Sequence, residues 1–370
     1  MRVFVCEFAE AHHNTFSTIY TLAQTAWKNS WAIVTSEVYR HINIPVRGIV
    51  FGLDKTAYKG KAIGEKVKVM FADMRDSLAI YRMIVSAIKP KKDDLFIFTT
   101  FEPWLSRHYG ALISLYRYLH KVGATVIVGI HNSFWFYYPE NVSDEERRLV
   151  ENHIKGWKKH VLLRYYLTKK LVSPQMIDGV LTLGPIKIPN NIPWIRLLDR
   201  IYEPNNLPKY DTFTISIPGA VDTGRRDYQT VAKAVSRLSF PVRVVLLGKL
   251  YDRNVLSYDW GKADIVYYED FVPEDVYVET LKKSHVVVAP VRDPYYGLFS
   301  VTGAVGDGVM AGIPVLAPEF YRDDLVINYS GVACLTSVLE NITILGKSPN
   351  YTFYTKEGLT HRFKRFVENL

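Results

Sequence analysis

The chain has 370 residues, more than one hydrophobic core usually supports, so its length predicts two domains. Hydrophobic residues make up 48% and charged residues 22%, which is typical of a globular protein and argues against a disordered chain. The formal net charge of +9 favours an anionic partner, and nucleotide diphosphates, anionic lipid surfaces and nucleic acids all qualify.

Cysteine content and hydropathy indicate the cellular compartment in which we expect the protein. The two cysteines, Cys6 and Cys334, give no disulfide framework and suit a reducing cytoplasm. No apolar run approaches the roughly 18 residues of a membrane span, and the opening MRVFVCEF indicates a strand and not a signal peptide. We therefore expect a cytoplasmic protein.

The first part of the chain alternates apolar strands with helical patterns. Strands are predicted at 3–8, 31–34, 46–51, 95–99, 125–130 and 179–183, and the clearest helices at 73–88 and 109–122. Continuous apolar strands in this alternation predict a parallel sheet that is covered on both faces. The expected fold class is α/β.

Two strand ends of this domain carry histidines, and ligands of parallel sheets bind beyond the carboxyl ends of the strands. His12, His13 and Thr15 follow the first strand, where a surface or helix-capping role is equally compatible with them. His131 follows the strand at 125–130. An imidazole there can exchange hydrogen bonds with a hydroxyl and shuttle a proton near neutral pH.

Aromatic residues gather in three further segments. The loops at 101–104 and 134–138 are as well explained by coverage of the sheet ends as by sugar or lipid contact. The segment 155–170, KGWKKHVLLRYYLTKK, follows a capping box from Ser143 to Glu146 and is predicted to be helical. Its basic and aromatic mixture fits a helix on an anionic membrane surface, or a helix with an apolar core side and a solvated basic side.

Repeated prolines between 185 and 212 interrupt the helix and strand patterns, so this segment is the predicted linker. We place an N-terminal domain at 1–204, a C-terminal domain at 205–356 and a last helix at 357–370.

The second domain opens with a strand and a glycine turn at Gly219, which leads to the adjacent pair Arg225 and Arg226. Planar guanidinium groups at the edge of a sheet suit phosphate oxygens, whereas such a pair elsewhere is usually a solvated face. The strand at 242–247 leads to Lys249, a further phosphate candidate or an ordinary surface lysine.

A βαβ unit at 285–319 gives the strongest functional signal. An interior glycine costs a helix about 1 kcal/mol relative to alanine, and this helix carries Gly303, Gly306, Gly308 and Gly312. Close approach of another backbone or of a ligand is the usual reason. Ser300 and Thr302 precede the helix, where their hydroxyls cap free N–H groups or leave them to an anion. The pattern predicts a phosphate pocket or a tightly packed helix.

The segment from Asp307 to Val315, DGVMAGIPV, resembles the donor-site stretch of retaining glycosyltransferases of the GT-B type, family 4 or glycosyl transferases group 1. The resemblance implies two Rossmann-like domains that face each other across a cleft. It also implies that Asp307 binds the ribose of a nucleotide sugar. The family has Glu there and a second Glu eight positions earlier, where this chain has Phe299, so that first carboxylate is either missing or displaced to Asp293.

The same resemblance assigns further residues. His131 takes the place of a strand-end histidine that faces the sugar, which makes His131 and Asp307 the catalytic candidates. Ala220 stands where the family commonly has another arginine. The segments 265–268 and 271–276 resemble the part that lines the nucleotide base, and the last helix is expected to pack on the first domain. The donor-binding candidates are Gly219, Arg225, Arg226, Lys249, Ser300, Thr302, Gly303 and Asp307.

The expected function is transfer of a sugar from a nucleotide-diphosphate sugar, held by the second domain, to a glycan, lipid or protein-linked acceptor on the first. Retention of configuration is implied by the resemblance, and the absence of Asp-x-Asp favours a reaction without metal or other cofactor. A sugar-nucleotide epimerase of the same architecture would need additional carboxylates in the cleft. A nucleotide-sugar-binding protein without turnover is the other alternative. Nucleic acid is not expected as a partner, because no recognised nucleic-acid motif is found.

Overall fold

The computed structural model of the chain describes residues 1–8, 13–42, 44–51, 78–100, 109–133, 142–154, 176–188, 191–345 and 350–370. These residues form two compact units, each considered by itself. Unit 1 comprises Met1–Leu183, Lys187–Asp199 and Thr360–Leu370, and unit 2 comprises Gly184–Ile186 and Arg200–Leu359.

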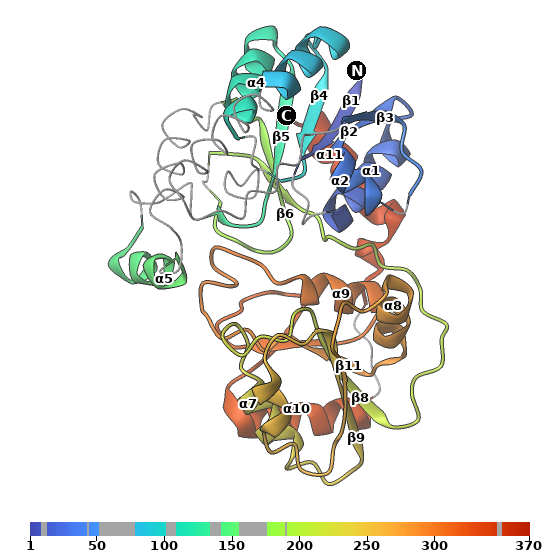
Figure 1. The fold of residues 1–370 in the computed structure, drawn as a ribbon, viewed down its shortest axis with the longest axis vertical. Coiled ribbons are helices and arrows are strands. Elements are labelled where there is room, and N and C mark those ends of the chain that lie inside the picture. Colours follow the sequence, from blue (N-terminus) through green and yellow to red (C-terminus); the bar gives the residue numbers. More distant parts are fainter. Residues whose placement is uncertain are drawn as a thin grey trace. The chain divides into compact units, whose positions relative to one another are not determined.

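Unit 1 is built on a parallel sheet of seven strands (Figure 1) in the order β3-β2-β1-β4-β5-β6-β7. The chain adds β2 and β3 on one side of β1 and then returns to add β4 on the other, so the topological switch point lies between β1 and β4. The strands are β1 (Val3–Glu7), β2 (Ser30–Thr35), β3 (Gly48–Phe51), β4 (Leu95–Phe98), β5 (Thr125–Ile130), β6 (Gly179–Thr182) and β7 (Trp194–Arg196).

Helices cover both faces of this sheet. On one face Phe98 packs edge-on against Tyr116 of α4, with ring centroids 4.7 Å apart. On the other face α1 packs against β1 and β2, and Trp27 meets Phe363 of α11 at 5.5 Å. The helices that contribute to unit 1 are α1 (His13–Ala26), α2 (Ser36–Arg40), the π-helical turn η2 (Ile84–Ile88), α4 (Tyr109–Val122), α5 (Asp144–Ile154) and α11 (Lys356–Glu368), whose first residues belong to unit 2.

Unit 2 contains a parallel sheet of six strands in the order β10-β9-β8-β11-β12-β13, which is the strand order of a Rossmann domain. Its switch point lies between β8 and β11. The strands are β8 (Phe213–Pro218), β9 (Val242–Lys249), β10 (Asp264–Tyr268), β11 (Val286–Val288), β12 (Val315–Pro318) and β13 (Ile327–Tyr329). The helices are α7 (Tyr228–Val235), α8 (Glu274–Lys283), α9 (Gly303–Ala311) and α10 (Gly331–Leu345), with short 3-10 turns η5 (Arg253–Ser257) and η6 (Thr352–Tyr354).

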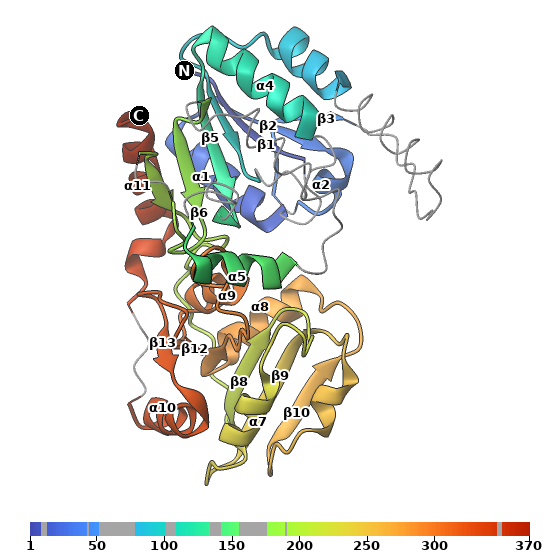
Figure 2. The ribbon, with the colours of Figure 1, turned by 90° about the vertical axis from the view of Figure 1, so that its left-hand side faces the viewer.

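The strands of unit 2 are apolar throughout because both faces are buried. Val244 and Leu246 of β9 point into a core shared with α7 and α10, whereas Val245 and Leu247 point into a second core shared with α8 and α9. Figure 1 shows α7 beside α10, and α8 beside α9. Figure 2 gives the view turned by 90°. The alternation confirms the predicted α/β class.

The structure contradicts one prediction, and several others concern residues that it does not describe. The segment 185–212 was predicted to contain no strand, but β7 lies within it, where Pro193 O accepts a hydrogen bond from Val180 N. A strand of three residues in a proline-rich segment is too short to give a periodic hydrophobic pattern. Several predictions fall outside the described residues: His12, the helix portion 73–77, the loops 101–104 and 134–138, and the basic segment 155–170. Among the described residues, no helix combines the length and hydropathy needed to cross a membrane.

Candidate functional site

A polar pocket lies at the switch point of unit 2, in the loops that follow β8 and β11. Its volume is about 130 Å³, and its lining consists of Arg225, Arg226, Val291, Tyr296, Val301, Thr302 and Gly303. Open parallel sheets bind ligands at this place, beyond the carboxyl ends of the strands on either side of the switch point. Four predicted donor-binding residues therefore meet in one pocket.

Backbone hydrogen bonds fix the two arginines at the pocket. The N–H groups of Arg225 and Arg226 donate to the carbonyl of Asp222, which forms a tight turn after β8. The N–H of Arg292 donates to the carbonyl of Arg225 at 3.1 Å, and Arg226 forms an antiparallel bridge with Val291. The loops after β8 and β11 are thus joined by main-chain contacts, which places both guanidinium groups at the switch point.

Gly219 ends β8 with a positive φ of 90°, a conformation that side chains with a Cβ rarely adopt. A Cβ at this position would lie only 2.6 Å from Nη2 of Arg226. Gly219 does not line the pocket, but its lack of a side chain leaves the space that the Arg226 guanidinium occupies.

The two guanidinium groups differ in their partners. Nη2 of Arg225 donates a hydrogen bond of 2.7 Å to the Tyr296 hydroxyl. Nη1 of Arg226 is buried and has no hydrogen-bond partner in the described part of the chain. Leaving a buried donor unpaired costs about 1–3 kcal/mol, and more for a charged group. The pocket therefore holds a cationic donor that is suited to an anionic oxygen.

Helix α9 begins at the pocket. Thr302 is its N-cap, and its hydroxyl accepts a hydrogen bond from the N–H of Ala304. The start of a helix carries partial positive charge, which adds to that of the arginines. Two of the predicted glycines have structural reasons, close packing for one and backbone conformation for the other. A Cβ at Gly308 would lie 2.2 Å from Val315 of β12, and Gly312 ends the helix with φ 69°.

Asp307 lies in the second turn of α9 and is buried. Its Oδ1 accepts from Nε of Arg200 at 2.9 Å, and its Oδ2 accepts from the hydroxyl of Tyr277 at 2.7 Å. Nη1 of Arg200 also donates to Glu274 at 2.6 Å. Burial raises the pKa of Asp307, while the charge of Arg200 and the Tyr277 hydroxyl oppose that rise. If Asp307 bound a ribose hydroxyl, its carboxylate would have to accept that hydrogen bond in addition to those from Arg200 and Tyr277.

Other predicted residues lie away from the pocket lining. Lys249 ends β9, where its Nζ lies 2.6 Å from Asp270 and 5.2 Å from the ring centroid of Phe271. Phe299, at the position of the family's first Glu, is a fully buried core side chain next to Tyr295. Asp293 accepts a hydrogen bond from the N–H of Tyr295 within the loop after β11. Ser300 is buried before the start of α9.

The switch point of unit 1 contains a buried carboxylate that no sequence pattern indicated. Glu7 ends β1, and its Oε2 accepts hydrogen bonds of 2.6 Å from the hydroxyls of both Thr99 and Thr100, which follow β4. His131 follows β5, the next strand, and is also buried. Gly129 permits close contact there, because a Cβ would lie 2.2 Å from the carbonyl oxygen of Thr99.

No protein-family model and no curated protein matches the chain in sequence. Solved structures match it over its whole length. A glycosyltransferase from Rickettsia africae is 10% identical with a TM-score of 0.54, and the match covers 100% of this chain and 93% of that one. Anabaena HepE, in complex with UDP, is 8% identical with a TM-score of 0.52 and full coverage of both chains.

The chain has the GT-B fold, with two Rossmann-like domains. A putative UDP-N-acetylglucosamine 2-epimerase from Listeria monocytogenes shares this fold at 10% identity and a TM-score of 0.53, with 100% of this chain and 96% of that one covered. Transferases and an epimerase thus occur among the similar GT-B structures. Identities this low carry the fold and not the reaction.

Proposed function

We propose that the protein is a glycosyltransferase that moves a sugar from a nucleotide-diphosphate sugar to a hydroxyl group of a glycan or lipid acceptor. The observation that carries the proposal is the cationic pocket at the switch point of unit 2. It combines two arginines, the start of α9 and a buried Nη1 of Arg226 without a partner in the described residues. A diphosphate supplies anionic oxygens that can accept hydrogen bonds from both arginines and from the N–H groups at the start of α9.

In the proposed reaction, the bond between C1 of the donor sugar and the β-phosphate oxygen breaks, and the acceptor oxygen bonds to C1. The proton of the acceptor hydroxyl leaves with the nucleoside diphosphate. Negative charge grows on that leaving group, so Arg225, Arg226 and the α9 N-terminus stabilise the transition state more than the ground state. Because these groups supply the positive charge, we propose a reaction without metal.

The finer assignments rest on the resemblance of the segment 307–315 to family 4. They are retention of configuration, a leaving phosphate that acts as base, and a role for His131 of unit 1 at the transferred sugar. The occupied carboxylate of Asp307 and the buried Phe299 separate this chain from the family pattern. NMR analysis of the product tests retention, by comparing the anomeric configuration of the product with that of the donor sugar.

A thermal-shift screen tests the donor site, because a ligand that binds only the folded state raises its apparent stability. Nucleoside diphosphates and their sugar conjugates are compared on the wild type and on Arg226→Ala. The matched control is Arg243→Ala, because Arg243 of the same unit forms an exposed ion pair with Asp264. A shift in wild type and control that is lost in Arg226→Ala supports the proposal. Equal shifts in all three proteins refute the pocket as the donor site.

Turnover separates the alternatives. The selected nucleotide sugar, incubated alone, gives an epimeric nucleotide sugar if the protein is an epimerase, the reaction named for the Listeria monocytogenes structure. Release of nucleoside diphosphate that depends on an added glycan or lipid acceptor indicates the transferase. Binding without either product indicates a nucleotide-sugar-binding protein.

A further inference from the structure

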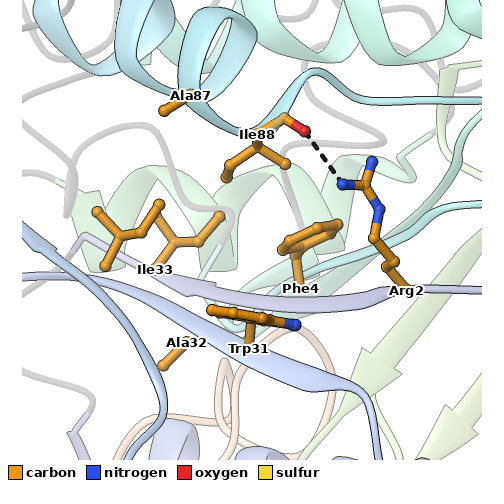
Figure 3. Close-up of a pocket in the computed structure, with 8 residues that line it drawn as sticks. Arg2, Phe4, Trp31, Ala32, Ile33, Ala87 and Ile88 are labelled. Carbon is orange, nitrogen blue, oxygen red and sulfur yellow. Dashed lines mark hydrogen bonds between the residues drawn. The ribbon is translucent and has the colours of Figure 1, made fainter.

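Unit 1 contains a second cavity, of about 160 Å³, between its sheet and the helical turn η2. We call it the apolar slot. Figure 3 shows side chains of the sheet on one side of the slot and Ala87 and Ile88 of η2 on the other. The sheet side is formed by Phe4, Trp31, Ile33 and Ile49.

The strand register explains why these four side chains share one face. Phe4 of β1 lies directly beside Trp31 of β2, and Ile33 of β2 lies beside Ile49 of β3. Neighbours at one level of a parallel sheet point to the same face, as do residues two apart on a strand. Phe4 and Trp31 lie near the amino ends of their strands, so the slot is at the opposite edge of the sheet from Glu7.

Arg2 closes one end of the slot without offering a free charge. Its guanidinium group donates to both carboxylate oxygens of Asp94, at 3.0 and 2.6 Å, and to the carbonyl of Ile88 at 3.2 Å, the bond drawn in Figure 3. A fourth hydrogen bond reaches the carbonyl of Lys89 at 3.1 Å. Arg2 therefore links the end of η2 to the edge of the sheet.

Two other cations neighbour lining residues of the slot, one through a ring contact and one through the chain. The guanidinium group of Arg47 stacks over the ring of Trp31 at 4.1 Å from its centroid and is exposed. Lys89 follows Ile88 directly and is also exposed. Neither forms an ion pair in the part of the chain that the structure describes. The carboxylates nearest to Lys89 in sequence are Asp93, which is exposed, and Asp94, which is paired with Arg2.

An apolar cavity of about 150 Å³ is large enough to take a benzene molecule. We infer that the slot binds the apolar chain of an anionic amphiphile, with its head group held by Arg47 and Lys89. The lining supplies the hydrophobic contact, and the two exposed cations supply charge complementarity. This inference does not depend on the proposed transferase reaction.

Calorimetric titration of the full chain with octanoate, acetate and octanol tests the inference. Octanoate is expected to bind in an equimolar ratio, and acetate, which lacks the chain, is not. The substitution Ala87→Phe places a ring in the slot from an exposed position of η2, and it should weaken octanoate by about tenfold or more. Arg47→Gln should weaken octanoate several-fold and leave octanol unchanged, because only octanoate carries a charge.

Arg226→Ala in unit 2 is the matched control and should bind octanoate like the wild type, which separates this result from failure of the donor site. Sedimentation with vesicles of phosphatidylglycerol distinguishes the source of the chain. Co-sedimentation that Ala87→Phe abolishes assigns it to a membrane lipid, and octanoate binding without co-sedimentation assigns it to a free amphiphile. Absence of octanoate binding, or binding that both Ala87→Phe and Arg47→Gln leave unchanged, overturns the inference.

Discussion

Nε of Arg200 lies 2.9 Å from Oδ1 of Asp307, and this ion pair connects the segment that precedes β8 to helix α9. The Tyr277 hydroxyl of α8 binds the other oxygen of the same carboxylate. One buried carboxylate thus joins α8, α9 and the segment that precedes β8. These contacts give Asp307 a structural role in unit 2, whether or not it also contributes to nucleotide binding.

Arg200→Ala should lower the free energy of unfolding by about 3–5 kcal/mol, because it leaves the buried Asp307 without its cation. Urea titration followed by circular dichroism measures the change. Tyr277→Phe is the milder comparison: it removes one hydrogen bond to a charged group, worth about 1.5–3 kcal/mol. If Arg200→Ala were as stable as the wild type, Asp307 would not depend on this pair.

Gly219→Ala should destabilise unit 2 and also weaken diphosphate binding, because the new Cβ meets Arg226 and the backbone has φ 90°. Gly331→Ala is the matched control for backbone strain. Gly331 has φ 73°, and a Cβ there meets nothing within 4 Å. Both variants should lose about 1 kcal/mol or more of stability, and only Gly219→Ala should lose affinity in a calorimetric titration. Equal affinity in the two variants would contradict the role of Gly219.

Stability should fall as the pH drops below about 6.5, partly because of His285. Burial lowers the pKa of His285, with a smaller contribution from the charge of Lys209, and its Nδ1 accepts a hydrogen bond from Thr214 N. The folded state binds this proton less readily than the unfolded chain, so acid favours unfolding. The free energy of unfolding, measured by urea titration above and below that pH, should change less in His285→Gln than in the wild type. An unchanged difference would remove His285 as a cause.

Glu7→Ala should destabilise unit 1 by about 2 kcal/mol or more, because it takes the shared acceptor from two buried hydroxyls. Glu7→Gln keeps an acceptor oxygen and should cost less. Urea titration gives both values, and donor binding in unit 2 should be the same for the two variants. Equal stability of Glu7→Ala and the wild type would show that Thr99 and Thr100 do not rely on this carboxylate.

The fold was predictable where apolar runs are long and flanked by polar residues. The strand at 125–130 and the helix at 109–122 have the predicted bounds. The short strands β7 and β13 and the helix α10 were not identified. β7 and β13 have three residues each, too few for a recognisable period, and they are held at the sheet by their neighbours β6 and β12.

The site was predictable only in its local parts. Arg225 and Arg226 stand together in the sequence, and Thr302 and Gly303 stand at the start of a glycine-rich helix, so each pair gives its own signal. Arg200 is 107 residues from Asp307, and Glu7 is 92 residues from Thr99, so no local pattern links them. Glu7 and Thr99 meet because β1 and β4 lie side by side, and Arg200 and Asp307 meet because the segment before β8 packs on α9.

The most direct test of the central claim is the affinity of the unit 2 pocket for the nucleoside diphosphate that the thermal-shift screen selects. Isothermal titration calorimetry compares the wild type, Arg226→Ala and the control Arg243→Ala. We expect Arg226→Ala to bind about tenfold to a hundredfold more weakly, because it loses a hydrogen bond between charged groups, while the control binds like the wild type. Equal affinity in all three proteins, or no binding by the folded wild type, would contradict it.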